Sequence, residues 1–106
     1  MKRFAFLLMI SLPAIAGDLD TARQSVLDQF LSDSEPTALD AAWTDKNVFK
    51  VAVTDTGRDR DGYAEYVCGE IYRAGLKGKG ILVRVVDYDR LTESGEWVNL
   101  GTEQCL

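Results

Sequence analysis

Residues 81–88 have the sequence ILVRVVDY, the strongest strand signal in the chain, and this stretch decides the fold. Its short length and its β-branched residues are typical of a β-strand. Residues 48–54 (VFKVAVT) form a second such run, in which only Lys50 and Thr54 are polar. Strands that are apolar on both faces are typical of the covered part of a sheet.

A helix is predicted between these two strands, over residues 62–74. Tyr63, Val67, Ile71 and Ala74 share one stripe at helical spacing. Gly75 follows as the residue that takes the left-handed conformation at a helix end. A strand, a crossover helix and a further strand form a β-α-β unit, so the two strands are expected to be parallel, with a right-handed crossover.

The flanking segments complete the predicted fold. Apolar side chains at spacings of three and four predict an N-terminal helix over residues 19–31. Residues 38–43 are expected to form a short helix behind a weak capping-box pattern, Thr37 to Asp40. Residues 93–96 are predicted as a turn, and residues 97–101 as a third strand antiparallel to 81–88. The expected class is α+β, close to α/β: an N-terminal helix, then a β-α-β-β order with a three-stranded mixed sheet packed on helices.

The first sixteen residues have the layout of a secretory signal peptide. Lys2 and Arg3 precede an apolar run over residues 4–12, and Pro13 and the Ala14-Ile15-Ala16 cleavage pattern follow. The apolar run is too short for a stable membrane anchor, since a spanning helix needs about 20 residues. We therefore expect cleavage near Ala16 and a single small domain over residues 17–106, located in the periplasm or secreted.

The mature chain is expected to be acidic. Loss of Lys2 and Arg3 lowers the Lys+Arg count from 12 to 10, against 17 Asp+Glu, which gives a net charge of −7. Nucleic-acid binding requires a basic surface and is not expected. The negative charge favours a basic partner, or it serves only solubility.

Two cysteines, Cys68 and Cys105, lie in the mature part, 37 residues apart. An even number of cysteines in an oxidising compartment predicts a structural disulfide. The competing interpretation is a pair of free thiols or a reactive Cys68. Gly69 and Glu70 follow that cysteine and the chain has no histidine, so nothing nearby lowers its pKa.

Both faces of the predicted sheet carry apolar residues, so the second face needs a cover. On residues 81–88, for example, Val83 and Val85 oppose Leu82 and Val86. The favoured expectation is that the N-terminal helices cover the second face. The alternative is that another chain does, because an exposed apolar face marks an interaction surface.

The polar loop over residues 55–61 is the candidate ligand or ion site. It follows a strand and precedes a helix, where α/β proteins bind ligands. Arg58 and Arg60 would hold an anion at the helix start. Asp59 and Asp61, followed by Gly62, match only the middle of a calcium-binding EF-hand loop, since Gly57 and Cys68 stand where carboxylates are needed. The competing interpretation is a connecting loop in which Asp55, Asp59 and Asp61 bond locally.

Catalysis has little support in the sequence. Without histidine there is no Ser-His-Asp triad and no His-ligated zinc site. The remaining enzymatic hypothesis uses paired carboxylates, Glu65 with Glu70 or Asp87 with Asp89. We expect no enzyme, no catalytic residue, no resident metal and no cofactor.

The predicted function is therefore a small exported protein–protein interaction module. It would be an inhibitor, an immunity-type protein or an accessory component of an envelope system. Its partner would be another envelope or secreted protein, or a second copy in a homodimer. The aromatic residues expected at the interface are Tyr66, Tyr72, Tyr88 and Trp97. The alternative function is a periplasmic domain that binds a small ligand, an anion or calcium through the loop over residues 55–61.

Overall fold

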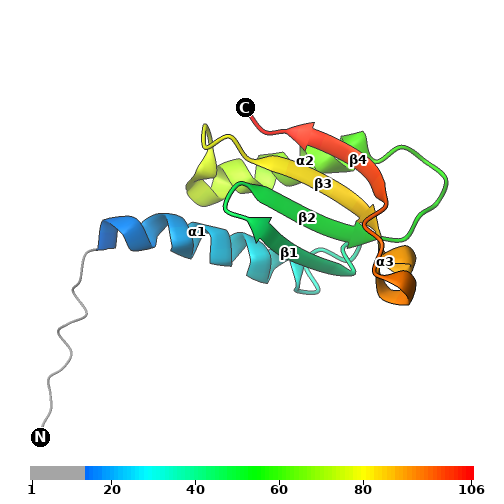
Figure 1. Ribbon diagram of the computed structural model, residues 1–106. Helices are drawn as coiled ribbons and strands as arrows, with labels where there is room; N and C mark the ends of the chain where they lie inside the picture. Colours follow the sequence, from blue (N-terminus) through cyan, green and yellow to red (C-terminus); the bar gives the residue numbers. More distant parts are fainter. Residues whose placement is uncertain (1–13) are drawn as a thin grey trace, which may run out of the picture.

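The computed structural model describes residues 14–106 and has an α+β fold with a four-stranded mixed sheet (Figure 1). The helix α1 (Ala14–Phe30) leads into the hairpin β1 (Asp40–Asp45) and β2 (Val48–Val53). The crossover α2 (Asp61–Ile71) continues as a π-helical turn η2 (Tyr72–Leu76). The strand β3 (Leu82–Asp87), a short helix α3 (Tyr88–Ser94) and β4 (Asn99–Gln104) complete the chain.

The sheet order β1-β2-β3-β4 confirms the predicted β-α-β unit. The central strands β2 and β3 are parallel, and the outer strands pair antiparallel with them. Gly75 ends the crossover helix with φ +100°, a left-handed conformation that glycine adopts without steric cost. The sheet therefore has a parallel centre made by the crossover and antiparallel edges made by short connections.

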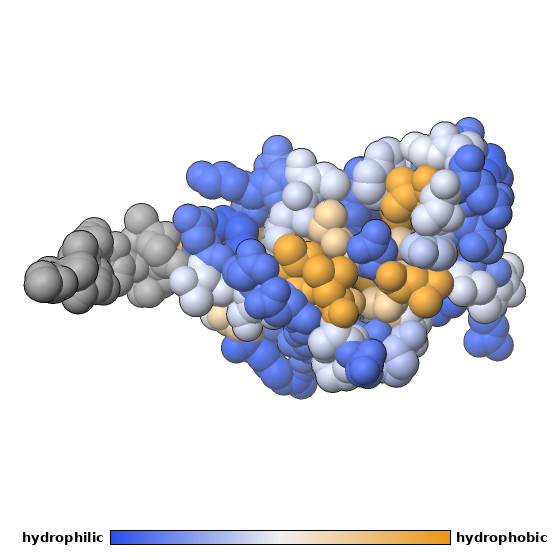
Figure 2. All heavy atoms as spheres, turned by 90° about the horizontal axis from the view of Figure 1, so that it is seen from below, coloured by the Kyte–Doolittle hydropathy of each residue, from blue (hydrophilic) through white to orange (hydrophobic). Residues whose placement is uncertain are grey.

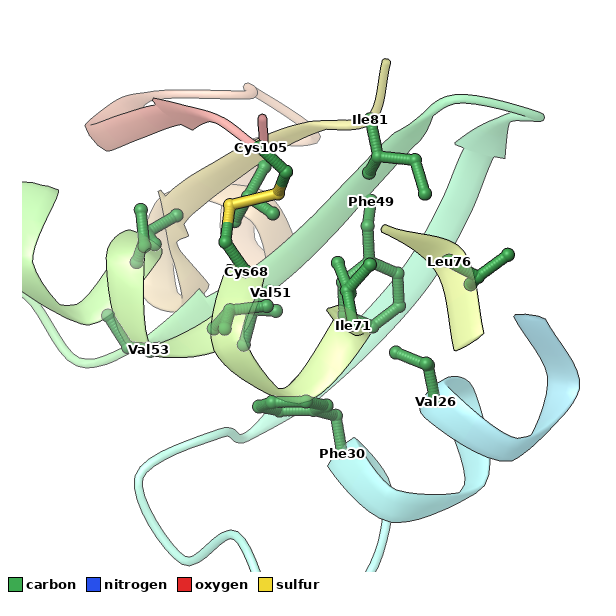
Figure 3. Close-up of a cluster of buried hydrophobic side chains, with 14 residues drawn as sticks. Val26, Phe30, Phe49, Val51, Val53, Cys68, Ile71, Leu76, Ile81 and Cys105 are labelled. Atoms are coloured by element: carbon green, nitrogen blue, oxygen red, sulfur yellow. A yellow bond between two sulfur atoms is a disulfide. The ribbon is translucent and has the colours of Figure 1, made fainter. Parts of the chain in front are cut away.

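The hydrophobic core lies between one face of the sheet and the two long helices (Figure 3). Phe49, Val51 and Val53 alternate along β2 and point toward the helices, as do Val83 and Val85 on β3. From the helix side, α1 contributes Val26 and Phe30, and α2 contributes Ala64, Val67, Cys68 and Ile71. Phe30 and Phe49 meet edge to face, 5.6 Å between ring centroids. This single core is what holds α1 and α2 on the same side of the sheet.

The predicted disulfide is confirmed. Cys68 of α2 is bonded to Cys105, just beyond β4, and the two Cα atoms lie 5.4 Å apart. Both cysteines are buried within the core. The bond ties the last strand to the crossover helix, and Figure 3 shows it beside Val51.

The expectation of a helix over residues 38–43 is wrong, because this segment forms the strand β1. Ala41 and Trp43 alternate onto the core side, and their partners on β2 are Val51 and Phe49. Pairing with β2 across the connection at Lys46 and Asn47 satisfies the backbone of this segment and overrides its weak capping pattern.

The last part of the chain also differs from the prediction. A helix that was not predicted, α3, lies between the expected strand and the turn expected over residues 93–96 and overlaps both at their ends. The Asp87 carboxylate accepts hydrogen bonds from Asp89 N at 3.0 Å and from Arg90 N at 3.3 Å at the start of this helix. The last strand is Asn99–Gln104 rather than 97–101. Asp87 is a favourable helix N-cap residue, and the strand therefore ends there rather than at Tyr88.

The outer edge of β4 is closed by the start of α2. Arg60 N donates to Leu100 O at 3.0 Å, and Thr102 N donates to an Asp61 carboxylate oxygen at 2.8 Å. In the described residues, no strand lies beside the outer edge of β1. Among the described residues the two edges therefore differ: the start of α2 is hydrogen-bonded to β4, and no strand follows β1.

The expected leader lies mostly outside the described residues. The helix α1 begins at Ala14 and runs through the expected cleavage point after Ala16. Within residues 14–106, no helix has both the length and the apolar character needed to cross a membrane.

Candidate binding face

The sheet face that points away from α1 and α2 is the main candidate site, and we call it the open face. The expectation that the N-terminal helices cover it is wrong, since α1 and α2 both pack into the core on the opposite face of the sheet. Their apolar residues fill the core on the other face, so none is left for this one. The open face consists of the alternate strand residues Asp40, Ala42, Val48, Lys50, Ala52, Leu82, Arg84, Val86, Thr102 and Gln104.

Two cations lie side by side at the centre of the open face. Lys50 of β2 and Arg84 of β3 are partners in the parallel register. Both side chains are half-buried among apolar neighbours. The ion pairs in the described part of the chain join Arg23 to Asp20, Arg73 to Glu70 and Arg90 to Glu96, and none involves Lys50 or Arg84. In an acidic protein, two cations without ion pairs among the described residues thus lie together on this face, with Asp40 of β1 as its acidic strand residue.

A hollow adjoins Lys50 at one end of the open face. It is shallow and open to solvent, and the 230 Å³ of space not filled by atoms includes open solvent. Its lining comes from β1, β2, β3 and the α3 region: Asp40, Ala41, Ala42, Lys50, Ala52, Val86, Leu91 and Trp97. Lys50 Nζ lies 4.1 Å from the centroid of the Trp97 ring, a cation–π contact that fixes the lysine at the mouth of the hollow.

The aromatic residues predicted for an interface do not form one patch. Trp97 is 50% exposed beside the open face, whereas Tyr66, 45% exposed, packs against Phe30 on the helix side. The Tyr72 hydroxyl accepts a hydrogen bond from Leu106 N, and Tyr88 is half-buried at the start of α3. Only Trp97 therefore adjoins the hollow.

The loop over residues 55–61 turns most of its polar groups toward its own backbone and β4. Asp55 accepts a hydrogen bond from Gly57 N at 2.8 Å, and Asp59 accepts one from Asp61 N at 3.4 Å. Arg60 donates to Thr54 O at 2.9 Å, while Arg58 is exposed. Within the described residues, no group of three or more acidic or cysteine side chains is arranged to hold a metal ion.

A second polar cluster joins α1, the segment after it and α2. The Gln29 amide donates to Glu35 at 2.7 Å and to Glu70 at 2.8 Å, and Glu70 also pairs with Arg73. The Tyr66 hydroxyl donates to Glu35 at 2.8 Å, and this hydrogen bond, helped by desolvation, raises the pKa of Tyr66 to about 12. Each carboxylate of the cluster therefore has a protein donor, as expected for a structural link.

The neighbouring Tyr63 is affected mainly by its burial. Burial raises the pKa of Tyr63 well above its usual range, and the negative charge of Glu35 adds to this effect. The Tyr63 ring stacks on Tyr66, 5.9 Å between centroids.

The carboxylates of the enzymatic hypothesis, Glu65 with Glu70 and Asp87 with Asp89, have different surroundings within each pair. Glu70 belongs to the Gln29 cluster, and Asp87 caps α3. Glu65 and Asp89 are exposed.

Sequence reasoning missed Lys50 and Arg84, although the signal was present. Both are central residues of apolar strands, with the same parity as Val48, Ala52, Leu82 and Val86. Strand alternation combined with the predicted parallel pairing would have placed the two cations together on the second face.

Exposed apolar residues also lie on the side that carries α1 and β1. Figure 2 shows apolar side chains gathered there between polar ones. Leu31 is 54% exposed and Leu39 is 48% exposed. Leu31 and Leu39 specify less about a partner than the paired cations of the open face do.

Comparisons of the chain with protein-family models, with curated proteins and with solved structures gave no match.

Proposed function

We propose that the protein is an exported protein–protein interaction module, of the inhibitor, immunity-type or envelope-accessory kind, and that the open face is its docking surface. The observation that carries the proposal is the pair Lys50 and Arg84, half-buried among apolar residues and free of ion pairs in the described residues. Neither charged group has a counter-charge among the described residues, so an anionic group of a docked partner would meet two unpaired cationic donors.

The disulfide supports the extracytoplasmic part of the proposal. Structural disulfides persist in oxidising compartments and are rare in the cytosol. The bond between Cys68 and Cys105 therefore fits a periplasmic or secreted protein. The net charge of the chain favours a partner whose surface is basic overall, because such a partner is attracted from a distance.

The test is a comparative capture from envelope extract with purified, oxidised protein. The bait proteins are wild type, Arg84→Gln, the double variant Lys50→Gln with Arg84→Gln, and Lys79→Gln. Lys79 is exposed in the turn before β3 and provides the matched loss of charge away from the open face. Circular dichroism and the melting temperature establish that each variant is folded.

We expect one partner in stoichiometric amount with wild type and Lys79→Gln, and its loss with the two open-face variants. A partner that is retained by the folded double variant would move the docking surface elsewhere. Absence of any partner, combined with a thermal shift by calcium or phosphate that Asp59→Ala or Arg60→Ala abolishes, would replace the proposal with ligand binding at the loop over residues 55–61.

A further inference from the structure

We infer that the open face takes an acidic segment of the partner protein, with one carboxylate between Lys50 and Arg84 and an apolar side chain in the adjoining hollow. The inference rests on the proposed function and adds the chemistry of the contact. It starts from the sign of the charge: a chain of net charge −5 concentrates two cations on a half-buried sheet face. The complementary group is therefore an anion.

The geometry of the two cations suits a carboxylate. Neighbouring strands lie about 4.8 Å apart, so the Lys50 and Arg84 side chains leave the sheet at that separation. A carboxylate has two oxygens and can accept from both groups at once. The planar guanidinium of Arg84 presents parallel donors that match a carboxylate, and Lys50 adds a compact charge held by the Trp97 ring.

The hollow supplies the second element of recognition. Ala52 and Val86 are partners in the sheet, two residues further along β2 and β3 than Lys50 and Arg84. Two residues of strand correspond to about 7 Å, which is also the distance between residues i and i+2 of an extended peptide. In an extended peptide, an acidic residue between Lys50 and Arg84 would therefore place the side chain two positions later in the hollow.

Asp40 disfavours a second acidic side chain in the hollow. Asp40 lines the hollow, and its carboxylate accepts a hydrogen bond from Ala41 N at 2.9 Å. A second acidic side chain in the hollow would face this charge, whereas an apolar one packs on Ala42, Leu91 and Trp97. The site thus distinguishes an acidic-apolar segment from a uniformly acidic one, and from a small free anion that leaves the hollow empty.

The experiment is an NMR titration of the oxidised, isotopically labelled protein with capped pentapeptides. The main probe is acetyl-Ala-Glu-Ala-Leu-Ala-amide. Replacing its Glu by Gln removes only the charge, and replacing its Leu by Ala removes only the apolar group. Sodium acetate is the free-anion arm. The reporters are the amides of Lys50 and Arg84 and the indole N–H of Trp97. The indole N–H of Trp43, which donates to Arg23 O on the other face, is the internal reference.

We expect millimolar binding of the Glu-Leu peptide, with shifts confined to the open-face reporters. The Gln probe and the Arg84→Gln protein should each bind about tenfold more weakly, as for the loss of one charge-assisted hydrogen bond. Equal binding of the Glu and Gln probes, shifts away from the open face, or no shift at all would overturn the inference. Acetate that reproduces the peptide shifts would reduce the site to a general anion site and overturn it as well.

Failure here is distinguishable from failure of the proposed function. If the folded Arg84→Gln variant loses the captured partner while the Glu probe binds no better than the Gln probe, the open face remains a docking surface and the carboxylate contact is wrong.

Discussion

Gly101 of β4 lies against the backbone of Arg60, where α2 begins. A Cβ atom at Gly101 would stand 2.5 Å from Arg60 O and 2.6 Å from Asp61 N. Real Cβ atoms do not approach backbone atoms so closely, so the fit of the crossover helix onto the last strand requires glycine here.

Gly101→Ala should therefore lower the free energy of unfolding. The helix start must move away from β4, and overpacking of this kind costs about 1–3 kcal/mol. Urea unfolding followed by circular dichroism measures the change. Gly69→Ala is the matched control, because it lies within α2 with no heavy atom near its added Cβ, and it should gain about 0.5–1 kcal/mol from reduced backbone entropy of the unfolded chain. Equal stability of the two variants would contradict the close approach.

Replacing both Cys68 and Cys105 by Ala should cost about 4 kcal/mol, because the disulfide closes a long loop of the unfolded chain, 37 residues apart in sequence. The measurement compares the urea midpoints of the double variant and of oxidised wild type. Reduced wild type serves as the control, since it keeps both side chains and should lose nearly as much. A loss that appears in the variant but not on reduction would assign the effect to packing instead.

The two tryptophans should respond differently to replacement by Phe. Trp43 Nε1 donates to Arg23 O at 2.9 Å and the ring packs on Phe49, so Trp43→Phe should destabilise by about 1 kcal/mol through the lost hydrogen bond. Trp97 is half exposed at the edge of α3, and Trp97→Phe should change the stability by less than about 0.5 kcal/mol. Thermal unfolding of the pair checks the difference, and a larger loss for Trp97→Phe would contradict it.

The hydrogen bond from Tyr66 to Glu35 should be visible in an alkaline titration. The pKa of Tyr66 is raised to about 12 in the folded protein, against an ordinary value of 10.0. The neutral hydroxyl is thus favoured by folding, and this stabilisation is complete below pH 10 and is lost as the pH rises toward 12. Ultraviolet difference titration of wild type against Tyr66→Phe isolates this tyrosine.

Glu35→Gln is the informative variant for that titration. It removes the carboxylate and should return the pKa of Tyr66 toward 10, while leaving an amide that still accepts a hydrogen bond. Asp33→Asn, an exposed change of the same kind two residues away, should leave the pKa of Tyr66 unchanged. A Tyr66 that titrates near 10 in wild type would contradict the link between α2 and the segment after α1.

Most of the fold follows from strongly patterned residues. The apolar runs around Val51 and Val85 fix two buried strands, the Tyr63 to Ala74 stripe fixes the crossover helix, and the cysteines fix the staple. The strand and helix patterns are local, and tertiary contacts did not change the type of these three elements. The segment containing Trp43 has no such pattern, and only its pairing with β2 makes it a strand.

The candidate site was less predictable because it depends on which face the helices leave open. Strand alternation separates Lys50 and Arg84 from the core residues, but whether α1 covers them depends on the packing of Val26 and Phe30. The sequence directed attention instead to the loop over residues 55–61, whose Asp side chains bond to nearby backbone amides. Charged residues in a loop are conspicuous, whereas a cation within an apolar strand is easily taken as a tolerated exception.

The difference between the two sheet edges limits how copies of this chain can join. Arg60 and Asp61 occupy Leu100 O and Thr102 N at the outer edge of β4, so among the described strands a strand from another molecule is favoured at β1. A fibre that grows by strand addition needs two available sheet edges on every subunit. In this chain one of the two edges, that of β4, is occupied by the start of α2. Two copies that pair through β1 would form a dimer with one continuous eight-stranded sheet. The start of α2 on β4 would then prevent a third copy from extending that sheet.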